Sequence, residues 1–396
     1  MRAGIWLAVC AILLSVPAGA ATRSVSRSVW VIARDQVTVR VVIPAAEASY
    51  TVAPGLPPPS NEKVAAYVLQ HLGVETAGSA CEAIDQGYDI GRINTLAAGP
   101  GLYGYEIIFH CPSAGRPTLK NAMLFERMPQ HVDYARIDLE GASITQLFTA
   151  QRQQLDLAVN AKSTGAGAYA SLGASHVAHS LQRVGFLLGL LLLARGGRDW
   201  LTAAAGLLLG YVCSAAILAM HLVPQAPSIE SALGLLVALC AVQWMAMRVQ
   251  QVWRLALILT ATLGLLSVAV WRVNGAMAWV LLGSAVFSGS FCIFAARRLD
   301  LFLWVLPLLF GVLDGVVLWG DYSRLHLWRE LGSSTLMFFN AGSLLMELGI
   351  MALLYAATVA WARIRGSTAF NSVAADAAAT ALAGMGAFWL LIQLKG

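Results

Sequence analysis

The stretch that decides the fold is Gly173–Gly197, with the sequence GASHVAHSLQRVGFLLGLLLLARGG. Its second half is an apolar run of the kind that enters a lipid bilayer. Its first half carries His176, His179 and Arg183 at spacings of three and four, which predicts that all three lie on one face of a helix. Ionisable side chains are expensive at membrane depth and are usually retained for a function. The stretch therefore predicts a membrane helix with a candidate site at its entrance.

The composition extends this prediction to the rest of the chain. Of the 396 residues, 58% are hydrophobic and only 12% are charged, and the mean hydropathy is +0.68. A soluble protein carries about 25% charged residues. Most of the uninterrupted apolar runs lie in residues 198–396, so we predict an α-helical polytopic membrane protein preceded by a polar domain. Much of the net charge of +5 is arginine in short loops, and no nucleic acid is expected as a partner.

Residues 1–20 have the plan of a signal peptide. MRAGIWLAVCAILLSVPAGA carries one early arginine, an apolar core and a small-residue end at Ala18 and Ala20. This pattern predicts secretion with cleavage after Ala20, and the alternative is an uncleaved anchor. Residues 21–160 are then expected to form an exported domain in the periplasm.

The exported domain is predicted to be small and mostly β. Partly alternating, β-branched or aromatic segments predict strands at 37–43, 105–110 and 134–139. The segment 61–75, NEKVAAYVLQHLGVE, follows a proline-rich stretch and predicts one amphipathic helix.

Cys81 and Cys111 are the only cysteines of this domain. An oxidising compartment makes a disulfide between them the expected state. The alternative is a two-cysteine metal site, which lacks a convincing third and fourth ligand. The adjacent His110 does not supply one, because neighbours in a strand point to opposite faces.

After a linker and helix entry at 161–175, residues 176–396 are predicted to form the transmembrane domain. The apolar stretches of this half, counted from the helix entry, are 170–194, 199–222, 229–247, 252–271, 275–295, 300–319, 334–361 and 375–393. Each is close to the ~20 residues needed to cross a bilayer, so about eight membrane helices are predicted.

The basic residues of the loops predict the orientation. With the exported domain outside, the inner loops hold Arg195, Arg198, Arg248, Arg254, Arg297, Arg298, Arg363 and Arg365. The outer loops and tail hold Arg272, Arg324, Arg329 and Lys395. This bias obeys the positive-inside rule and agrees with the signal peptide. We therefore expect a bacterial inner-membrane protein whose N-terminal domain and C-terminus are both periplasmic.

Counting from the loops places several polar residues in the half of the membrane that faces the exported domain. The candidate metal-binding or polar cluster is His176, His179, Cys213, Asp314 and Glu347. The alternative is that the histidines are hydrated near the headgroups and that Cys213 is a small buried residue.

The order of several short motifs resembles the HupE/UreJ family of nickel permeases, which are linked to hydrogenase and urease maturation. Framework residues that match family motifs are Gly173, Ser214, Glu230, Asn340 and Gly342. The segments Phe310–Gly315 (FGVLDG) and AGMGAFWLLIQL near the C-terminus are also similar to the family. The chain looks closest to the branch with an exported N-terminal domain.

The resemblance implies transport of nickel through ligands at positions 176, 182, 183, 213 and 314. Only His176 keeps the family residue, because Gln182 and Arg183 replace an acid–histidine pair and Asp314 replaces a histidine. An arginine cannot ligate a cation. One hypothesis is therefore transport of nickel or another transition metal through a degenerate site, where the Cys213 thiolate would favour copper(I) or zinc.

The second hypothesis is a non-transporting scaffold or sensor whose periplasmic domain binds a partner that the sequence does not identify. An enzyme is not expected, because no nucleophile–base pair or phosphate loop is present, and no resident cofactor is implied. In either case Arg183 and Asp314 have opposite charges at similar depth, which predicts an intramembrane ion pair. The alternative is that Arg183 extends to the headgroups alone while Asp314 lines a hydrated cavity.

Overall fold

The structure is a computed structural model in which part of the chain is described. The described residues are 24–33, 35–49, 59–84, 92–98, 101–112, 115–139, 141–159, 162, 164–219, 227–248, 252–271, 278, 281–289, 299–324, 328–365 and 372–393. The signal peptide predicted for residues 1–20 lies outside them.

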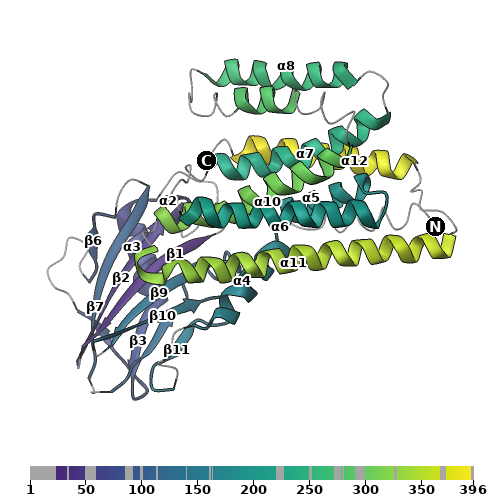
Figure 1. Cartoon of the computed structure of the whole chain (residues 1–396). Coiled ribbons are helices and arrows are strands. Elements are labelled where there is room, and N and C mark those ends of the chain that lie inside the picture. Colours follow the sequence, from purple (N-terminus) through teal and green to yellow (C-terminus); the bar gives the residue numbers. More distant parts are fainter. Residues whose placement is uncertain are drawn as a thin grey trace. The chain divides into compact units, whose positions relative to one another are not determined.

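The chain divides into two compact units. One holds Thr22–Ala168 with Asp321–Ser334, and the other holds Tyr169–Gly320 with Thr335–Gly396. The strands all belong to the first unit, whereas most of the second is helical (Figure 1). The prediction of an N-terminal β domain followed by a mostly helical remainder is confirmed.

Two sheets build the β domain. The larger has the order β10-β9-β1-β2-β7-β5, with β6 also paired to β7, and the smaller has the order β11-β8-β3-β4. The larger sheet comprises β1 (Val25–Ile32), β2 (Gln36–Pro44), β5 (Glu82–Ala83), β6 (Asn94–Leu96), β7 (Leu102–His110), β9 (Val132–Leu139) and β10 (Ala142–Phe148). The smaller comprises β3 (Leu72–Thr76), β4 (Ser79–Ala80), β8 (Thr118–Asn121) and β11 (Gln154–Asp156). All pairs are antiparallel except β1 with β9.

Period-two burial explains these strands. On β2, the side chains of Val37, Val39, Val41 and Ile43 are all buried, and the residues between them are more exposed. Both sheets and one face of the helix α3 (Asn61–His71) share a single hydrophobic core. The three predicted strands lie within β2, β7 and β9.

The predicted helix 61–75 is too long by one turn. The helix α3 ends at His71, and Leu72 already has extended backbone angles of −105° and 139°. The next residues alternate between buried and half-buried positions in β3 and pair with β8. Pairing with β8 therefore overrides the helical pattern of the last residues.

The predicted disulfide is present. Cys81 and Cys111 are bonded, with their Cα atoms 4.4 Å apart, and both are buried. His110 is exposed, as expected for the neighbour of a buried residue in a strand. Cys81 lies between β4 of the smaller sheet and β5 of the larger, so the bond fixes the place where the chain passes from one sheet to the other.

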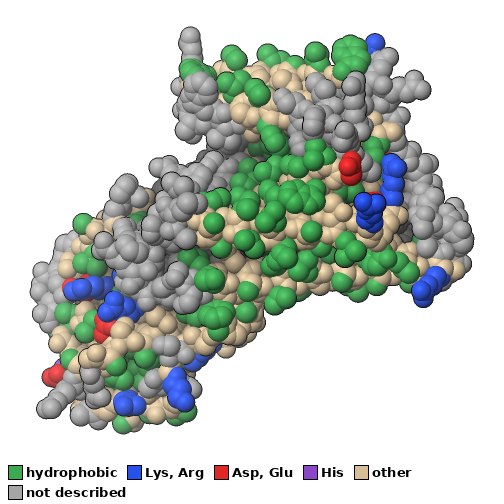
Figure 2. Space-filling view, in the orientation of Figure 1, with side chains coloured by type: hydrophobic (Ala, Val, Ile, Leu, Met, Phe, Trp, Pro, Cys, Tyr) green, Lys and Arg blue, Asp and Glu red, His purple; other side chains and the backbone are tan. Residues whose placement is uncertain are grey.

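The helical unit follows the predicted apolar stretches. Its helices are α4 (Ala166–Ala178), α5 (Leu181–Leu193), α6 (Gly197–Ala219), α7 (Pro227–Arg248), α8 (Val252–Val270), α10 (Leu299–Arg324), α11 (Trp328–Arg365) and α12 (Ser372–Gln393). Residues 281–289 are also helical. Figure 2 shows hydrophobic side chains over much of the visible face of these helices.

The number of membrane spans is supported only in part. Among the described residues, Gly197–Ile217 and Thr335–Trp361 are long and apolar enough to cross a membrane, and α4 with α5 makes a third if the bent pair is one span. The described apolar parts of α7 and α8, Ala232–Met247 and Ala256–Val270, are shorter. The finding is two or three candidate spans, where the sequence predicts about eight.

The first predicted membrane helix is broken. The axes of α4 and α5 differ by 65°, so His176 lies on α4, His179 lies at the break and Arg183 lies on α5. The prediction that these three share one helical face is wrong. Ser180 leaves the helical region with angles of −93° and 107°, and its hydroxyl accepts a hydrogen bond from Arg183 Nη1 at 3.0 Å.

Glycines let several helices touch backbone to backbone. A Cβ atom on Gly342 of α11 would lie 1.9 Å from the carbonyl oxygen of Ala170, and one on Gly173 of α4 would lie 2.1 Å from that of Phe339. Such contacts allow no larger side chain and are typical of membrane helix pairs. The resemblance of Gly173 and Gly342 to family motifs therefore has a packing explanation.

Candidate functional site

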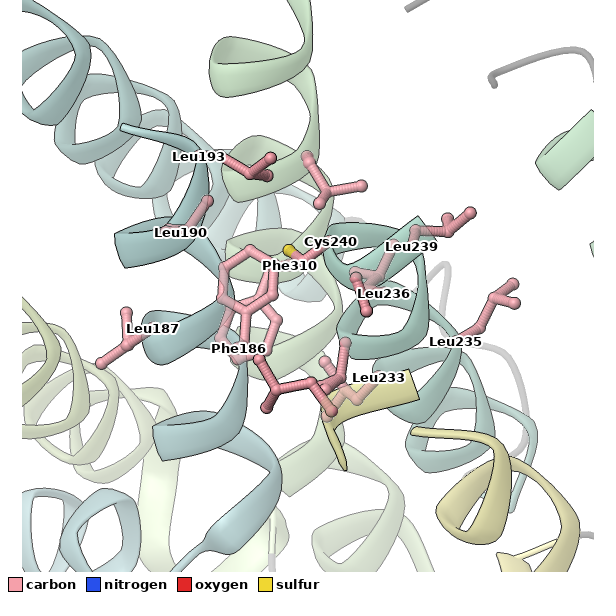
Figure 3. Close-up of a cluster of buried hydrophobic side chains, with 14 of the residues drawn as sticks. Phe186, Leu187, Leu190, Leu193, Leu233, Leu235, Leu236, Leu239, Cys240 and Phe310 are labelled. Carbon is pink, nitrogen blue, oxygen red and sulfur yellow. The ribbon is translucent and has the colours of Figure 1, made fainter. Parts of the chain in front are cut away.

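The candidate site begins beside an aromatic stack. The rings of Phe186 on α5 and Phe310 on α10 lie parallel, with their centroids 3.9 Å apart (Figure 3). Leucines of α5 and α7 and the buried Cys240 surround them. Because Arg183 is three residues before Phe186 and Asp314 is four residues after Phe310, the same two helix faces carry both the stack and the two charges.

The predicted ion pair between Arg183 and Asp314 is formed in the structure. Arg183 Nη2 contacts Asp314 Oδ1, and both side chains are buried. The hydroxyl of Tyr211 on α6 donates a hydrogen bond to the other oxygen, Oδ2, at 2.5 Å. Both carboxylate oxygens of Asp314 thus face a protein partner, which removes them as free ligands for a cation.

Glu347 of α11 lies close to this pair. Its side chain has no exposed surface, and neither carboxylate oxygen has a hydrogen-bond partner among the described residues. The Tyr211 hydroxyl is near, but its proton is directed to Asp314. Burying a carboxyl group without donors is costly, so this residue needs an explanation.

The other residues of the predicted metal cluster lie elsewhere. His176 is half-buried on α4, with its ring 5.9 Å from that of Phe339, and His179 is exposed at the helix break. Cys213 is a half-buried free thiol on α6. Within the described part of the chain, no three histidine, cysteine, aspartate or glutamate side chains are grouped so that they would hold a metal ion.

Two of the remaining framework residues make helix contacts. Ser214 donates to the carbonyl of Tyr211 one turn earlier, and Asn340 of α11 donates to the carbonyl of Gly315 on α10 at 3.1 Å. The side chain of Glu230 lies outside the described residues. These bonds connect helices and bind no ligand.

Tyr211 is a site residue that sequence reasoning missed. It immediately precedes the Val212–Ser214 turn that resembles the family. A tyrosine inside an apolar helix has a hydroxyl that requires a partner, and this was the available signal.

A second buried polar cluster lies in the β domain. Its members are Ser24, Ser26, Ser28, Asn121, His131 and Asp133, all buried. The carboxylate of Asp133 accepts hydrogen bonds from Ser26 at 2.6 Å, from Ser28 at 2.5 Å and from the Asn121 amide at 2.9 Å. His131 is hydrogen-bonded to Ser24 through Nδ1 and to Ser26 through Nε2. Because the Ser26 proton goes to Asp133, the ring donates from Nε2 and accepts from Ser24 at Nδ1, which is the neutral form.

Burial shifts the two titrating groups of this cluster in opposite directions. Desolvation lowers the pKa of His131 from 6.5 to about 3, against the effect of the Ser24 contact. Desolvation also raises the pKa of Asp133 from 3.8 to about 6, although its three hydrogen bonds favour the charged form. With every member enclosed, the cluster is a structural element of the sheet and not an accessible catalytic site.

These shifts predict an unusual pH dependence. Between pH 3.8 and 6, folded Asp133 holds a proton that the unfolded chain has lost, so its contribution to stability falls as pH rises. In the same window the unfolded chain holds a proton on His131 that the folded chain lacks, so that contribution rises with pH. The two terms cancel in the wild type. His131→Gln should therefore lose up to about 3 kcal/mol of local stability from pH 4 to pH 6, at about 1.4 kcal/mol per pKa unit.

The measurement is hydrogen exchange of the β1 and β9 amides in the full-length protein, corrected for the intrinsic pH dependence of exchange. Asp133→Asn is the matched control and should show the opposite slope, with stability rising over the same window. Equal pH profiles for the wild type and both variants would contradict the assigned shifts.

The comparisons with known proteins leave these sites to be interpreted from their own geometry. No protein-family model matches the chain, and no curated protein matches it.

Proposed function

We propose that the chain is a multi-pass inner-membrane protein of the HupE/UreJ type in which an ion pair has replaced the metal site. In this proposal the helical unit is a non-transporting scaffold, and the periplasmic β domain binds a partner protein. The observation that carries the proposal is the buried Arg183–Asp314 pair with its bond from Tyr211. A fixed cation stands where the related permeases have a ligand, and the neighbouring carboxylate is already occupied.

The surface of the helical unit supports a membrane location. On α8, Leu257, Leu265 and Val268 are 62%, 71% and 73% exposed, and α6 and α11 carry similar exposed apolar residues. Apolar patches of this extent are unfavourable in water and suit lipid contact. The close glycine contacts between α4 and α11 agree with this environment.

Transition-metal transport is the second candidate function. Glu347 favours it, because a buried carboxyl without a hydrogen-bond partner is a free oxygen donor close to Asp314. The metal would then be a substrate that passes the site.

Metal content distinguishes the two candidates. Cells with and without the gene are grown in limiting nickel, cobalt, copper or zinc, and their metal content is measured. The scaffold proposal expects no difference for any of the four metals. Accumulation that Glu347→Gln abolishes, and that the exposed-site variant Arg198→Ala leaves intact, would instead support transport.

The proposed topology gives a separate prediction. A reporter that is active only in the periplasm should be active when fused after Lys395 and inactive when fused after Arg298, because eight spans return the chain to the outside. A reporter that is active only in the cytoplasm should give the reverse pattern. An inactive periplasmic reporter after Lys395 would mean that one of the eight stretches does not cross, with the described parts of α7 and α8 the first to be re-examined.

A further inference from the structure

Four helices each bring one polar side chain to the same buried place. These side chains are Arg183 of α5, Tyr211 of α6, Asp314 of α10 and Glu347 of α11. Each is at most 6% exposed. The group thus contains two carboxyl groups and a single guanidinium.

The hydrogen bonds divide these groups unequally. Arg183 contacts Asp314 through Nη2 and donates to Ser180 through Nη1. Tyr211 donates its only hydroxyl proton to Asp314. Asp314 therefore receives a cation and a donor, whereas Glu347 receives neither.

Charge balance then decides the state of Glu347. One guanidinium balances one carboxylate, and Asp314 is the carboxylate that it contacts. A second ionised carboxylate, enclosed and without donors, is an uncompensated buried charge, which proteins avoid by neutralising the group. A protonated carboxyl is neutral and fits the enclosure.

We propose that Glu347 is a proton-binding site, and that loss of its proton moves the Arg183 guanidinium from Asp314 toward Glu347. In this step Glu347 gives one proton to water and becomes a carboxylate, and no other bond breaks except the contacts of Arg183. The inference goes beyond the scaffold proposal and does not depend on what the β domain binds.

The position of Arg183 connects this proton to the helix break. Its guanidinium holds the hydroxyl of Ser180, the residue at which α4 and α5 diverge by 65°. Movement toward Glu347 would release that contact. The helix α4 also packs on α11, the helix that carries Glu347, through Gly173 and Gly342. The site therefore joins protonation of one carboxyl to the angle between two helices.

The groups that face Glu347 set the expected response. They are Arg183, Tyr211 and Asp314, from three different helices. On α4, His176 contacts the same helix two turns earlier, against Phe339. Arg183 is the cation close enough to compensate an ionised Glu347, and it is available only by leaving Asp314.

Infrared spectroscopy of the full-length protein in lipid nanodiscs tests the proposal. The wild type should show the carbonyl band of a protonated carboxylic acid in an apolar environment. The band should be lost in Glu347→Gln, which is isosteric with the protonated acid and should keep the wild-type folded yield. It should persist in the matched control Asp376→Asn, which removes a carboxyl of α12 that binds Trp244.

Asp314→Asn tests the exchange itself. Without Asp314, Arg183 is free to compensate Glu347, so Glu347 should ionise and the band should also disappear. A band that survives in Glu347→Gln, or that is absent from the wild type, overturns the proton site. A band that survives in Asp314→Asn overturns the exchange of Arg183.

Isotope labelling gives the same answer without a substitution. In the wild type grown with glutamate that carries ¹³C at the side-chain carboxyl, the band should shift to lower frequency. With the corresponding aspartate it should not move. A shift with labelled aspartate alone would assign the proton to Asp314 and overturn the proposal, whereas the metal-content experiment above would be unaffected.

Discussion

Arg183→Ala and Asp314→Ala should each destabilise the helical unit by about 3–5 kcal/mol, because each removes one partner of a buried pair and leaves the other charge uncompensated. The effect is measured as the midpoint of thermal unfolding, and as folded yield, of the full-length protein in detergent. The double variant should recover part of the loss, because it contains neither charge. If the two single losses simply add in the double variant, Arg183 and Asp314 are not energetically coupled.

Two controls accompany this cycle. Arg198→Ala removes an exposed arginine of α6 and should change stability by no more than about 0.5 kcal/mol. Tyr211→Phe removes only the bond to Asp314 and should cost about 1–3 kcal/mol, the range for a hydrogen bond to a charged group. The proton site adds an asymmetry. Asp314→Ala should cost less than Arg183→Ala, since Glu347 remains to compensate Arg183.

The ion pair was predictable because the physics of the bilayer restricts the alternatives. An arginine and an aspartate at similar depth on two apolar helices either find each other or reach water. The depth count placed Arg183 and Asp314 together without any knowledge of the helix packing. The same count gave no reason to choose Tyr211, since a tyrosine in an apolar helix can also lie at the headgroups.

The helix break was not predictable from spacing. His176, His179 and Arg183 keep the intervals of a continuous helix, and no proline or unusual glycine marks the junction. The break is stabilised by Arg183 reaching back to Ser180 while its other nitrogen binds a distant helix. A contact that depends on tertiary structure has no local sequence signal.

The β domain shows the same limit in a strand. The alternating apolar residues of β2 place its inner face correctly. In β1, Ser24, Ser26 and Ser28 alternate in the same manner, and a polar series of this kind is usually read as the solvent face. They are buried because His131 and Asp133 lie opposite and complete their hydrogen bonds. The partners come from a segment more than one hundred residues away, so the pattern of β1 alone gives the wrong face.

Removing the disulfide with the double variant Cys81→Ala, Cys111→Ala should destabilise the β domain by about 3–4 kcal/mol, the value of the loop-entropy model for a separation of 30 residues. The loss should be largest where the bond connects the sheets. Cys81 lies between β4 and β5, and Cys111 follows the end of β7. Hydrogen exchange in the full-length protein should therefore accelerate first at β4, β5 and the end of β7, and last at the centre of β1 and β9.

The matched control is Cys213→Ala, which removes a free thiol from α6 and should leave exchange in the β domain unchanged. Alkylation of the untreated protein gives an independent check, because Cys81 and Cys111 should resist the reagent until a reductant is added. If both thiols react without reductant in protein isolated from the periplasmic side of the membrane, the disulfide is not formed there. If exchange in the double variant accelerates equally across both sheets, the bond stabilises the domain through the unfolded chain alone and does not hold the passage from β4 to β5.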